Sequence, residues 1–252
     1  SISRDTFSIT IYAPEAAKAA HAGQFANISA PGFTLRRPIS ICEFSRSRGT
    51  LRFVFEVRGK GTEAISRLNV GDNLDVLGPL GNGFAIPDSA RRAVLVGGGI
   101  GVPPMLGLAK KLGDRATAIL GFRDYSRIIL ADEFEKYGAA TAICTDDGSV
   151  GYNGMVTGPL ESTLKNTGAD IVTYGAPVLP GAMFLVSYLD GVPVCGLPGC
   201  VMYAKRTIFD LLLPRLLAND AITAEDIARL GEGGLCLGCA ECHWPNCGFG
   251  HF

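Results

Sequence analysis

The chain has 252 residues, a formal net charge of −1, and a composition of 47% hydrophobic and 19% charged residues. This supply of apolar residues excludes an intrinsically disordered chain, and the balanced charge excludes the basic surface that nucleic-acid binding requires. No apolar run in the sequence reaches the roughly 18 residues of a membrane-spanning helix, and the N-terminus lacks a signal-peptide pattern. We therefore expect neither nucleic acid nor membrane among the partners.

The first 89 residues are rich in β-branched and aromatic residues, and turns containing glycine and proline divide them into short segments. Such a pattern is typical of a small antiparallel β-barrel. Strands are predicted over 7–12, 38–44, 50–57 and 73–77, and one short helix over 62–68. We expect this domain to span residues 1–89, with its boundary near 88–92.

Between residues 90 and 195, strand patterns alternate with helical ones, which indicates an α/β domain with a parallel sheet. Strands are predicted over 93–96, 116–120, 140–145, 170–174 and 192–195, and helices over 104–112, 131–137, 159–164 and 182–188. From residue 196 onward, helical segments lead into a cysteine-rich tail. Residues 196–252 are therefore predicted to form a small helical and cysteine-rich metal-cluster module.

A glycine-rich turn, VGGGIG at 96–101, joins the first strand of the α/β domain to the next helix. Glycines let the backbone approach a dinucleotide pyrophosphate, and a helix N-terminus favours its negative charge. Asp124 follows at the end of the next strand, where an acidic side chain suits an adenosine ribose. Arg123 and Arg127 beside it suit a 2′-phosphate instead, so the choice between NAD and NADP stays open. The candidate cofactor-binding residues of this turn are Gly98, Gly99, Ile100 and Gly101.

Three phrases in the β-rich domain precede this turn: RRPISI at 36–41, GKGT at 59–62 and GPLGNGF at 78–84. A β-rich domain with these phrases, followed by a nucleotide domain, resembles the ferredoxin–NADP reductase superfamily. The resemblance implies that Arg37 contacts the pyrophosphate of FAD, for which a guanidinium is a bidentate ligand. It further implies that Pro38, Ile39 and Ser40 line the isoalloxazine ring, and that Gly59, Gly61 and Thr62 bind a flavin phosphate.

Within that superfamily the chain resembles the electron-transfer subunit of class 1B dihydroorotate dehydrogenase. The phrases VGGGIGVPPM, GFRD and TDDGSVGYNG extend the match, which covers residues 1 to about 195. The resemblance implies bound FAD, NAD(H) or NADP(H), an iron–sulfur cluster, a catalytic oxidoreductase partner and a cytoplasmic location. It also implies that Thr145, Asp146 and Asp147 lie beside the nicotinamide nucleotide.

Four cysteines, Cys236, Cys239, Cys242 and Cys247, lie within twelve residues of one another near the C-terminus. The family carries a [2Fe–2S] cluster on a C-x4-C-x2-C opening, whereas this tail reads C-x2-C-x2-C-x4-C. Three thiolates at such spacing are typical of a [4Fe–4S] cluster, with Cys247 or the more distant Cys200 as the fourth ligand. A structural zinc site is the competing interpretation, because C-x2-C pairs also hold zinc.

The last 80 residues carry a second resemblance, to molybdopterin-binding, molybdenum-cofactor-synthesis-like proteins of anaerobic bacteria. It depends on the phrases YGAPVLPGAMF, GLPGCVMY and LGEGGLCLGC, at 174–184, 196–203 and 230–239. The partner implied by this tail is a molybdenum or tungsten enzyme.

The combined pattern predicts an electron-transfer subunit that moves electrons between NAD(P)H, FAD and an iron–sulfur cluster for a partner oxidoreductase. Hydride transfer to a flavin needs orientation more than acid–base catalysis, so no catalytic residue is assigned. Two alternatives stay open. One is a stand-alone NAD(P)H reductase that acts on ferredoxin, and the other is a molybdenum-cofactor-related binding protein with a structural zinc tail.

Overall fold

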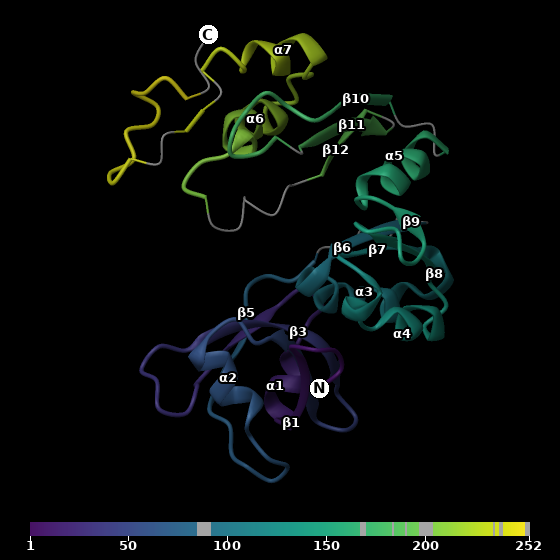
Figure 1. Ribbon diagram of the computed structural model, residues 1–252, viewed down its shortest axis with the longest axis vertical. Helices are drawn as coiled ribbons and strands as arrows, with labels where there is room; N and C mark the ends of the chain where they lie inside the picture. Colours follow the sequence, from purple (N-terminus) through teal and green to yellow (C-terminus); the bar gives the residue numbers. More distant parts are fainter. Residues whose placement is uncertain are drawn as a thin grey trace. The chain divides into compact units, whose positions relative to one another are not determined.

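The structure is a computed structural model that describes residues 1–84, 92–166, 170–182, 184–189, 191–196, 204–233, 235–236 and 239–249. The chain divides into two compact units, Ser1–Leu160 and Glu161–Phe252, whose elements are drawn in sequence colours in Figure 1. The predicted domain boundary near 88–92 lies almost wholly outside the described residues, so the predicted domain limits stay a prediction.

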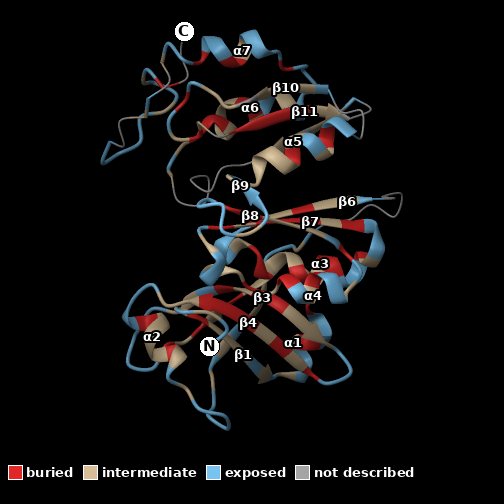
Figure 2. Cartoon of the chain, turned by 45° about the vertical axis from the view of Figure 1, so that its right-hand side comes forward, coloured by how far each residue is buried: buried red, intermediate tan, exposed pale blue. Residues whose placement is uncertain are grey.

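The first unit begins with a five-stranded antiparallel sheet in the order β1-β4-β3-β2-β5. The strands are β1 Thr6–Tyr12, β2 Phe25–Ile28, β3 Arg37–Ser45, β4 Thr50–Glu56 and β5 Val76–Leu80, and the helices are α1 Pro14–Ala19 and α2 Lys60–Ser66. Strand side chains point alternately to opposite faces. Leu51, Phe53 and Phe55 of β4 accordingly lie in one core, inside the antiparallel domain, while Val54 belongs to another. Buried residues run along β3 and β4 in Figure 2.

The same unit continues into a parallel sheet in the order β6-β7-β8-β9. Its strands are β6 Ala93–Gly98, β7 Ala116–Phe122, β8 Ala140–Thr145 and β9 Tyr152–Asn153, and its helices are α3 Pro103–Leu112 and α4 Ala131–Lys136. Helix α5, Thr157–Asn166, begins in this unit and ends in the second. A proline occupies the first turn of α3, where its missing N–H costs nothing. Cys42 and Val54 of the antiparallel domain pack into one core with Leu106 of α3. An antiparallel β-domain followed by a parallel α/β sheet is the predicted fold class, which is thus confirmed.

The second unit contains a separate antiparallel sheet in the order β10-β11-β12. Its elements are β10 Asp170–Tyr174, β11 Leu185–Leu189, β12 Val192–Gly196, α6 Ile208–Leu217 and α7 Ala224–Arg229. The predicted helix over 182–188 is therefore wrong, because most of that segment is strand β11. The strands predicted over 170–174 and 192–195 do form, but each pairs antiparallel with β11 instead of joining the parallel sheet. Gly191, at φ +77°, lies in the turn between β11 and β12, and an antiparallel neighbour needs only such a short turn.

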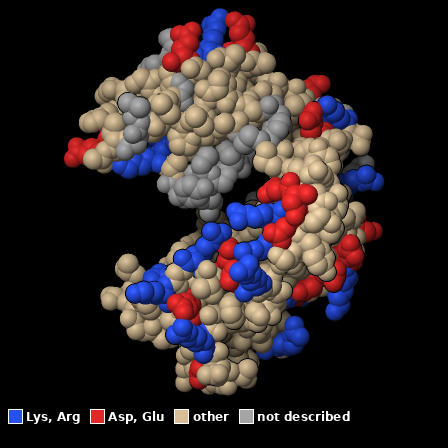
Figure 3. Space-filling model, in the orientation of Figure 1, with Lys and Arg blue, Asp and Glu red and all other residues tan. Residues whose placement is uncertain are grey.

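Most other predicted elements form within a few residues of their expected limits, although the strand predicted over 73–77 is shifted to 76–80. The sequence interpretation missed α1, β2 and the short strand β9. Within the described residues, no helix combines the length and apolar character needed to cross a bilayer. On the face drawn in Figure 3, Lys and Arg side chains are interspersed with Asp and Glu side chains over the first unit.

Candidate cofactor-binding site

Arg37 and Gly61 are in contact. They belong to two separate sequence motifs, RRPISI at 36–41 and GKGT at 59–62, and both were predicted to bind phosphate groups of the flavin. Arg37 begins β3, and Gly61 is a buried residue in the first turn of α2. A Cβ atom built on Gly61 would stand 2.3 Å from Nε of Arg37, so glycine is what admits the guanidinium. Nη1 of Arg37 donates to the Leu35 carbonyl at 2.6 Å, and the guanidinium lies over the Phe33 ring at 5.5 Å from its centroid. A cation is thereby held beside the N-terminus of α2.

The hydroxyl of Thr62 is occupied within its own turn. Oγ1 accepts hydrogen bonds from the N–H groups of Arg58 at 3.0 Å and Gly59 at 3.3 Å, and it donates to the Gly59 carbonyl at 3.0 Å. Thr62 therefore shapes the turn that precedes the helix. The groups left for an anion are the guanidinium of Arg37 and the first N–H groups of α2, which have no partner inside a helix.

The flavin-ring residues predicted on β3 alternate between its two faces, as strand residues do. Ile39 is 7% exposed and packs in the antiparallel core. Pro38 is exposed and Ser40 is partly exposed. Two of the three side chains are thus available to a ligand, while the side chain of Ile39 supports the strand from behind.

The glycine-rich turn after β6 combines one crowded glycine with three open ones. A Cβ on Gly97 would stand 2.9 Å from the Cα of Val102, whereas Cβ atoms on Gly98, Gly99 and Gly101 would meet nothing within 4 Å. Gly99 has φ +50°, a conformation that favours glycine. No side-chain hydrogen bond caps α3. The helix begins with two prolines, which have no N–H, and the N–H of Met105 donates to the Val102 carbonyl at 3.0 Å. The turn therefore presents bare glycine backbone to open space, which lets a pyrophosphate approach closely.

The remaining nucleotide candidates follow β7 and β8, at the carboxyl edge of the parallel sheet where β6 also ends. The loops after these strands are joined, because the N–H groups of Asp146 and Asp147 donate to the carbonyls of Phe122 at 3.1 Å and Arg123 at 3.3 Å. Asp124 lies in the loop that follows β7, at this same edge of the sheet. Its Oδ1 accepts from the N–H of Ser126 at 2.8 Å, so part of that carboxylate caps the turn that follows.

Two of the residues predicted to lie beside the nicotinamide nucleotide, Thr145 and Asp147, make hydrogen bonds within the loop that follows β8. Thr145 is fully buried, and its hydroxyl donates to the Val150 carbonyl at 2.8 Å. Asp147 accepts hydrogen bonds from Ser149, which lower the pKa of its carboxyl. Asp146 is exposed. Asp147 is exposed as well. The loop is thus a folded unit in which both carboxylates face solvent, and only that of Asp147 has hydrogen bonds within the loop.

The two arginines beside Asp124 have different surroundings. Nη1 of Arg127 lies 3.3 Å from Asp5 and 3.6 Å from Glu56, both in the antiparallel domain. Arg123 is exposed. Arg127 therefore joins the two halves of the first unit, and Arg123 is the arginine that points to solvent at the carboxyl edge.

Sequence reasoning missed a polar cluster at the junction of the antiparallel and parallel sheets, formed by Glu43, Arg52, Lys110, Glu133 and Tyr137. Arg52 donates to Glu133 through Nη1 at 2.6 Å and Nη2 at 3.0 Å. Glu43 accepts from Tyr137 Oη at 2.6 Å and pairs with Lys110. The alternation of Glu43 and Arg52 with apolar neighbours is a signal that they face out of the antiparallel core, but their partners on the parallel side lie 67 to 94 residues away in sequence.

The four predicted metal ligands lie in the second unit. Cys236 and Cys247 pack against its apolar core, while Cys239 and Cys242 are exposed. Among the described residues, no group of three or more His, Cys, Asp or Glu side chains is arranged to hold a metal ion. The cysteines do not form a coordination sphere in this structure, and Cys200 lies outside the described residues. They stay predicted ligands.

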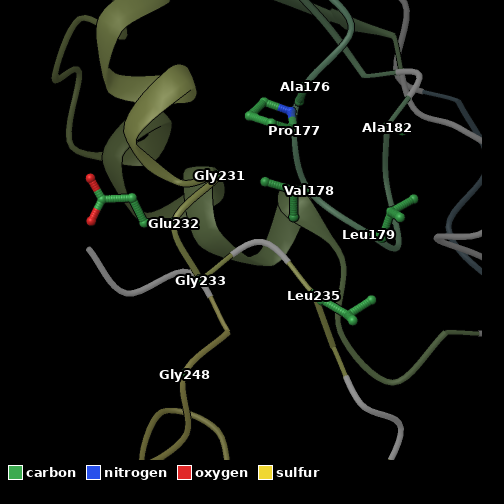
Figure 4. Close-up of a pocket in the computed structure, with 10 residues that line it drawn as sticks. All are labelled: Ala176, Pro177, Val178, Leu179, Ala182, Gly231, Glu232, Gly233, Leu235 and Gly248. Atoms are coloured by element: carbon green, nitrogen blue, oxygen red, sulfur yellow. The ribbon is translucent and has the colours of Figure 1, made fainter.

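The second unit also has an apolar cavity of about 600 Å³ that the sequence did not indicate (Figure 4). One wall is formed by 176–179 and Ala182, and the other by 231–233, Leu235 and Gly248. The walls are joined by a bridge between Leu179 and Leu235 and by the Cys236 N–H, which donates to the Leu179 carbonyl at 2.8 Å. The one charged lining residue, Glu232, directs its carboxylate away from the cavity in Figure 4.

Solved structures similar to this chain support the fold. An NADH-dependent reduced ferredoxin–NADP oxidoreductase is 32% identical with a TM-score of 0.59, over 66% of this chain and 60% of that one. The ferredoxin reductase of carbazole 1,9a-dioxygenase matches with a TM-score of 0.56 at 19% identity, over 66% of this chain and 55% of that one. At such identity the second match supports the fold alone. No protein-family model matches the chain.

Curated relatives identify the family. The electron transfer subunit of dihydroorotate dehydrogenase B (NAD(+)) from Streptococcus pneumoniae strain R6 is 37% identical over 78% of this chain and 70% of its own length. The subunits of the same description from Streptococcus mutans and Fusobacterium nucleatum are 36% and 39% identical, over 73% and 62% of this chain. The chain spans 66% and 63% of the length of these two relatives. This chain belongs to the family of electron-transfer subunits of dihydroorotate dehydrogenase B.

Proposed function

We propose that the protein binds FAD on its antiparallel β-domain and NAD(H) at the carboxyl edge of its parallel sheet, and that it passes electrons from the nicotinamide to a partner oxidoreductase. The observation that carries this proposal is the contact between Arg37 and Gly61. It places a guanidinium beside a helix N-terminus in the same compact unit as the open glycine turn at 98–101. Two anion sites in one unit suit two dinucleotides.

Each part of the chain has a defined task in this function. FAD, when bound, would accept two electrons from the nicotinamide as a hydride and release them one at a time. Arg37 and the first turn of α2 neutralise its phosphates, and β3 presents Pro38 and Ser40 to the ring. The turn at 98–101 holds the second pyrophosphate by backbone N–H groups. Orientation of the two ligands is the protein's main contribution, so we assign no acid or base.

We propose NAD(H) rather than NADP(H) as the nucleotide. Asp124 lies at the end of β7, where a carboxylate suits a ribose with a free 2′-hydroxyl. Arg127, one of the two candidates for a 2′-phosphate, is directed toward Asp5 and Glu56. The names of the curated relatives specify NAD(+).

We propose a catalytic oxidoreductase subunit as the electron acceptor, by analogy with the subunits to which the chain is related, and a cytoplasmic location that suits the clustered cysteines. A ferredoxin is the alternative acceptor. A molybdenum or tungsten enzyme is favoured only by the resemblance of the tail. Because the tail cysteines do not assemble in this structure, no electron-transfer step is assigned to them.

The test is an anaerobic visible spectrum of the protein after incubation with FAD and removal of unbound flavin, followed by titration with NADH and, separately, NADPH. We expect retained flavin absorption that bleaches with NADH at a lower concentration than with NADPH. A colourless protein that takes up no FAD would contradict the proposal. Iron and zinc measured on the same sample separate the two interpretations of the tail.

A further inference from the structure

The polar cluster at the junction of the two sheets connects the elements that hold the two proposed ligands. Strand β3 carries Arg37 at its start and Glu43 near its end. Helix α3 follows the glycine turn and carries Lys110 in its last turn. Glu43 pairs with Lys110. One ion pair thus joins the strand of the flavin site to the helix of the nucleotide site.

Glu43 has more than one partner at this junction. Its Oε1 accepts from Tyr137 Oη at 2.6 Å, and its Oε2 lies 3.7 Å from Nη1 of Arg52, its cross-strand neighbour on β4. Arg52 extends the cluster to Glu133 of α4 by two hydrogen bonds. The side chains of Glu43 and Arg52 are 12% and 20% exposed, so the centre of the cluster is largely shielded from water, while Lys110 is 41% exposed at its rim.

The charges of the cluster are balanced and mutually supporting. Burial opposes ionisation of Glu43, but hydrogen bonds from Lys110 and Tyr137 and the charges of Lys110 and Arg52 outweigh it and lower the pKa of the carboxyl. Burial and the bond to Glu43 raise the pKa of Tyr137. Burial likewise raises the pKa of the neighbouring Cys42 thiol to about 12, so Cys42 adds no charge. Glu43 therefore acts as an anion between two cations and a phenol.

Helix α3 packs closely against the antiparallel domain beneath the cluster. A Cβ atom on Gly107 of α3 would stand 3.3 Å from the Cβ of Ala22 and 3.5 Å from the carbonyl oxygen of Cys42. Leu106 and Ala109 on either side of Gly107 are fully buried. The glycine lets the helix approach the antiparallel sheet closely, and the ion pair of Lys110 with Glu43 is a second contact of the helix with β3.

We propose that Glu43 is a positioning residue for hydride transfer: by joining β3 to α3 and to Tyr137, it sets where the glycine turn, and so the nicotinamide, stands relative to the flavin strand. Reaction between two bound ligands depends steeply on their separation, since a misplacement of about 1 Å costs on the order of 100-fold in rate. The inference rests on the proposed function and deepens it.

The experiment compares Glu43→Gln and Tyr137→Phe with wild type and with Glu135→Gln, a matched loss of one exposed carboxylate on neighbouring α4. For each FAD-loaded protein, anaerobic stopped-flow reduction by NADH gives the limiting rate and the apparent dissociation constant. We expect the limiting rate of Glu43→Gln to fall about tenfold. The limiting rate of Tyr137→Phe should also fall, and that of Glu135→Gln should equal the wild-type rate. The dissociation constant and FAD content stay within about twofold, because each ligand keeps its own contacts.

A double-mutant cycle with Lys110→Met separates positioning from general weakening. If both side chains act through one contact, the double variant Glu43→Gln/Lys110→Met loses little more rate than Glu43→Gln alone. Limiting rates of Glu43→Gln and Tyr137→Phe equal to wild type would overturn the inference, as would a fall in rate matched by an equal loss of FAD or NADH affinity. A wild-type protein whose bound FAD is not reduced by NADH would instead overturn the proposed function, and this inference with it.

Discussion

At the scale of single residues, the contact between Arg37 and Gly61 makes a sharp prediction. In Gly61→Ala the new Cβ would stand 2.3 Å from Nε of Arg37, so the guanidinium must move from its place beside α2. We expect the affinity for FAD to fall about tenfold or more, and we expect a similar fall in Arg37→Ala, which removes the charge-assisted bond. Equilibrium dialysis of the apoprotein against FAD gives the dissociation constants.

The neighbouring arginine provides the control for this prediction. Arg36 pairs with Asp75 at 2.5 Å and donates to the carbonyl oxygens of Asn27 and Asp75, so its guanidinium serves the antiparallel sheet. Arg36→Ala should keep the FAD affinity of wild type. Equal losses in Arg36→Ala and Arg37→Ala would show that the two arginines act only through general surface charge.

The lowered pKa of Glu43 makes a prediction about stability and pH. Because this pKa is lower in the folded protein than its ordinary value of 4.5, the carboxylate stabilises the fold above that value, and the contribution is lost as the pH falls through the folded pKa. We expect Glu43→Gln to lower the free energy of unfolding by about 2 kcal/mol near pH 7, and the difference from wild type to shrink only as the pH falls below 4.5 toward the lowered pKa of the folded protein. Urea titrations across that range measure it. A difference that is independent of pH would contradict the charge argument, and Glu135→Gln should show little difference throughout.

At the scale of elements, alanine substitutions at two adjacent glycines near the end of β6 should have different effects, one on stability and the other on NADH binding. Gly97→Ala places a Cβ 2.9 Å from the Cα of Val102, whereas Gly98 has an extended backbone and open space before it. We expect Gly97→Ala to destabilise the fold by about 1 to 3 kcal/mol. Gly98→Ala should keep stability and FAD but weaken NADH binding, because its methyl group occupies the approach of the pyrophosphate. Thermal melting and NADH titration of both variants separate these outcomes, and normal NADH affinity in Gly98→Ala would contradict the proposed role of the turn.

Helices and strands with a strong local sequence pattern could be predicted from the sequence. Strands whose conformation depends on pairing with a neighbouring strand could not. The alternation in β4 and the strand–glycine–helix pattern around 93–112 are local, and both were predicted nearly in register. The apolar run before residue 190 fits a helix or a strand, and the Asp-Gly pair at 190–191 was the missed signal of a hairpin. In the site, Arg37 and Gly61 could be found from separate motifs. The cluster around Glu43 could not, because it joins residues that come together only in the folded unit.

At the scale of the whole molecule, the division into two units predicts where each activity resides. The first unit contains two apolar cores of its own, one inside the antiparallel sheet and one shared with the parallel sheet. Both proposed dinucleotide sites lie in this unit, and the four tail cysteines lie in the second. Loss of the second unit should therefore separate flavin chemistry from metal binding.

A fragment of residues 1–166, which ends with α5, tests that separation. We expect it to fold cooperatively, retain FAD and be reduced by NADH at a rate within about threefold of the full chain, since orientation of both ligands depends on contacts inside the first unit. It should bind neither iron nor zinc. The full chain with Cys239→Ser and Cys242→Ser is the matched control, because it loses metal while keeping the second unit. If the fragment is folded but its flavin is no longer reduced while this control remains active, the second unit contributes to the nucleotide site itself, and the assignment of both sites to residues 1–160 is wrong.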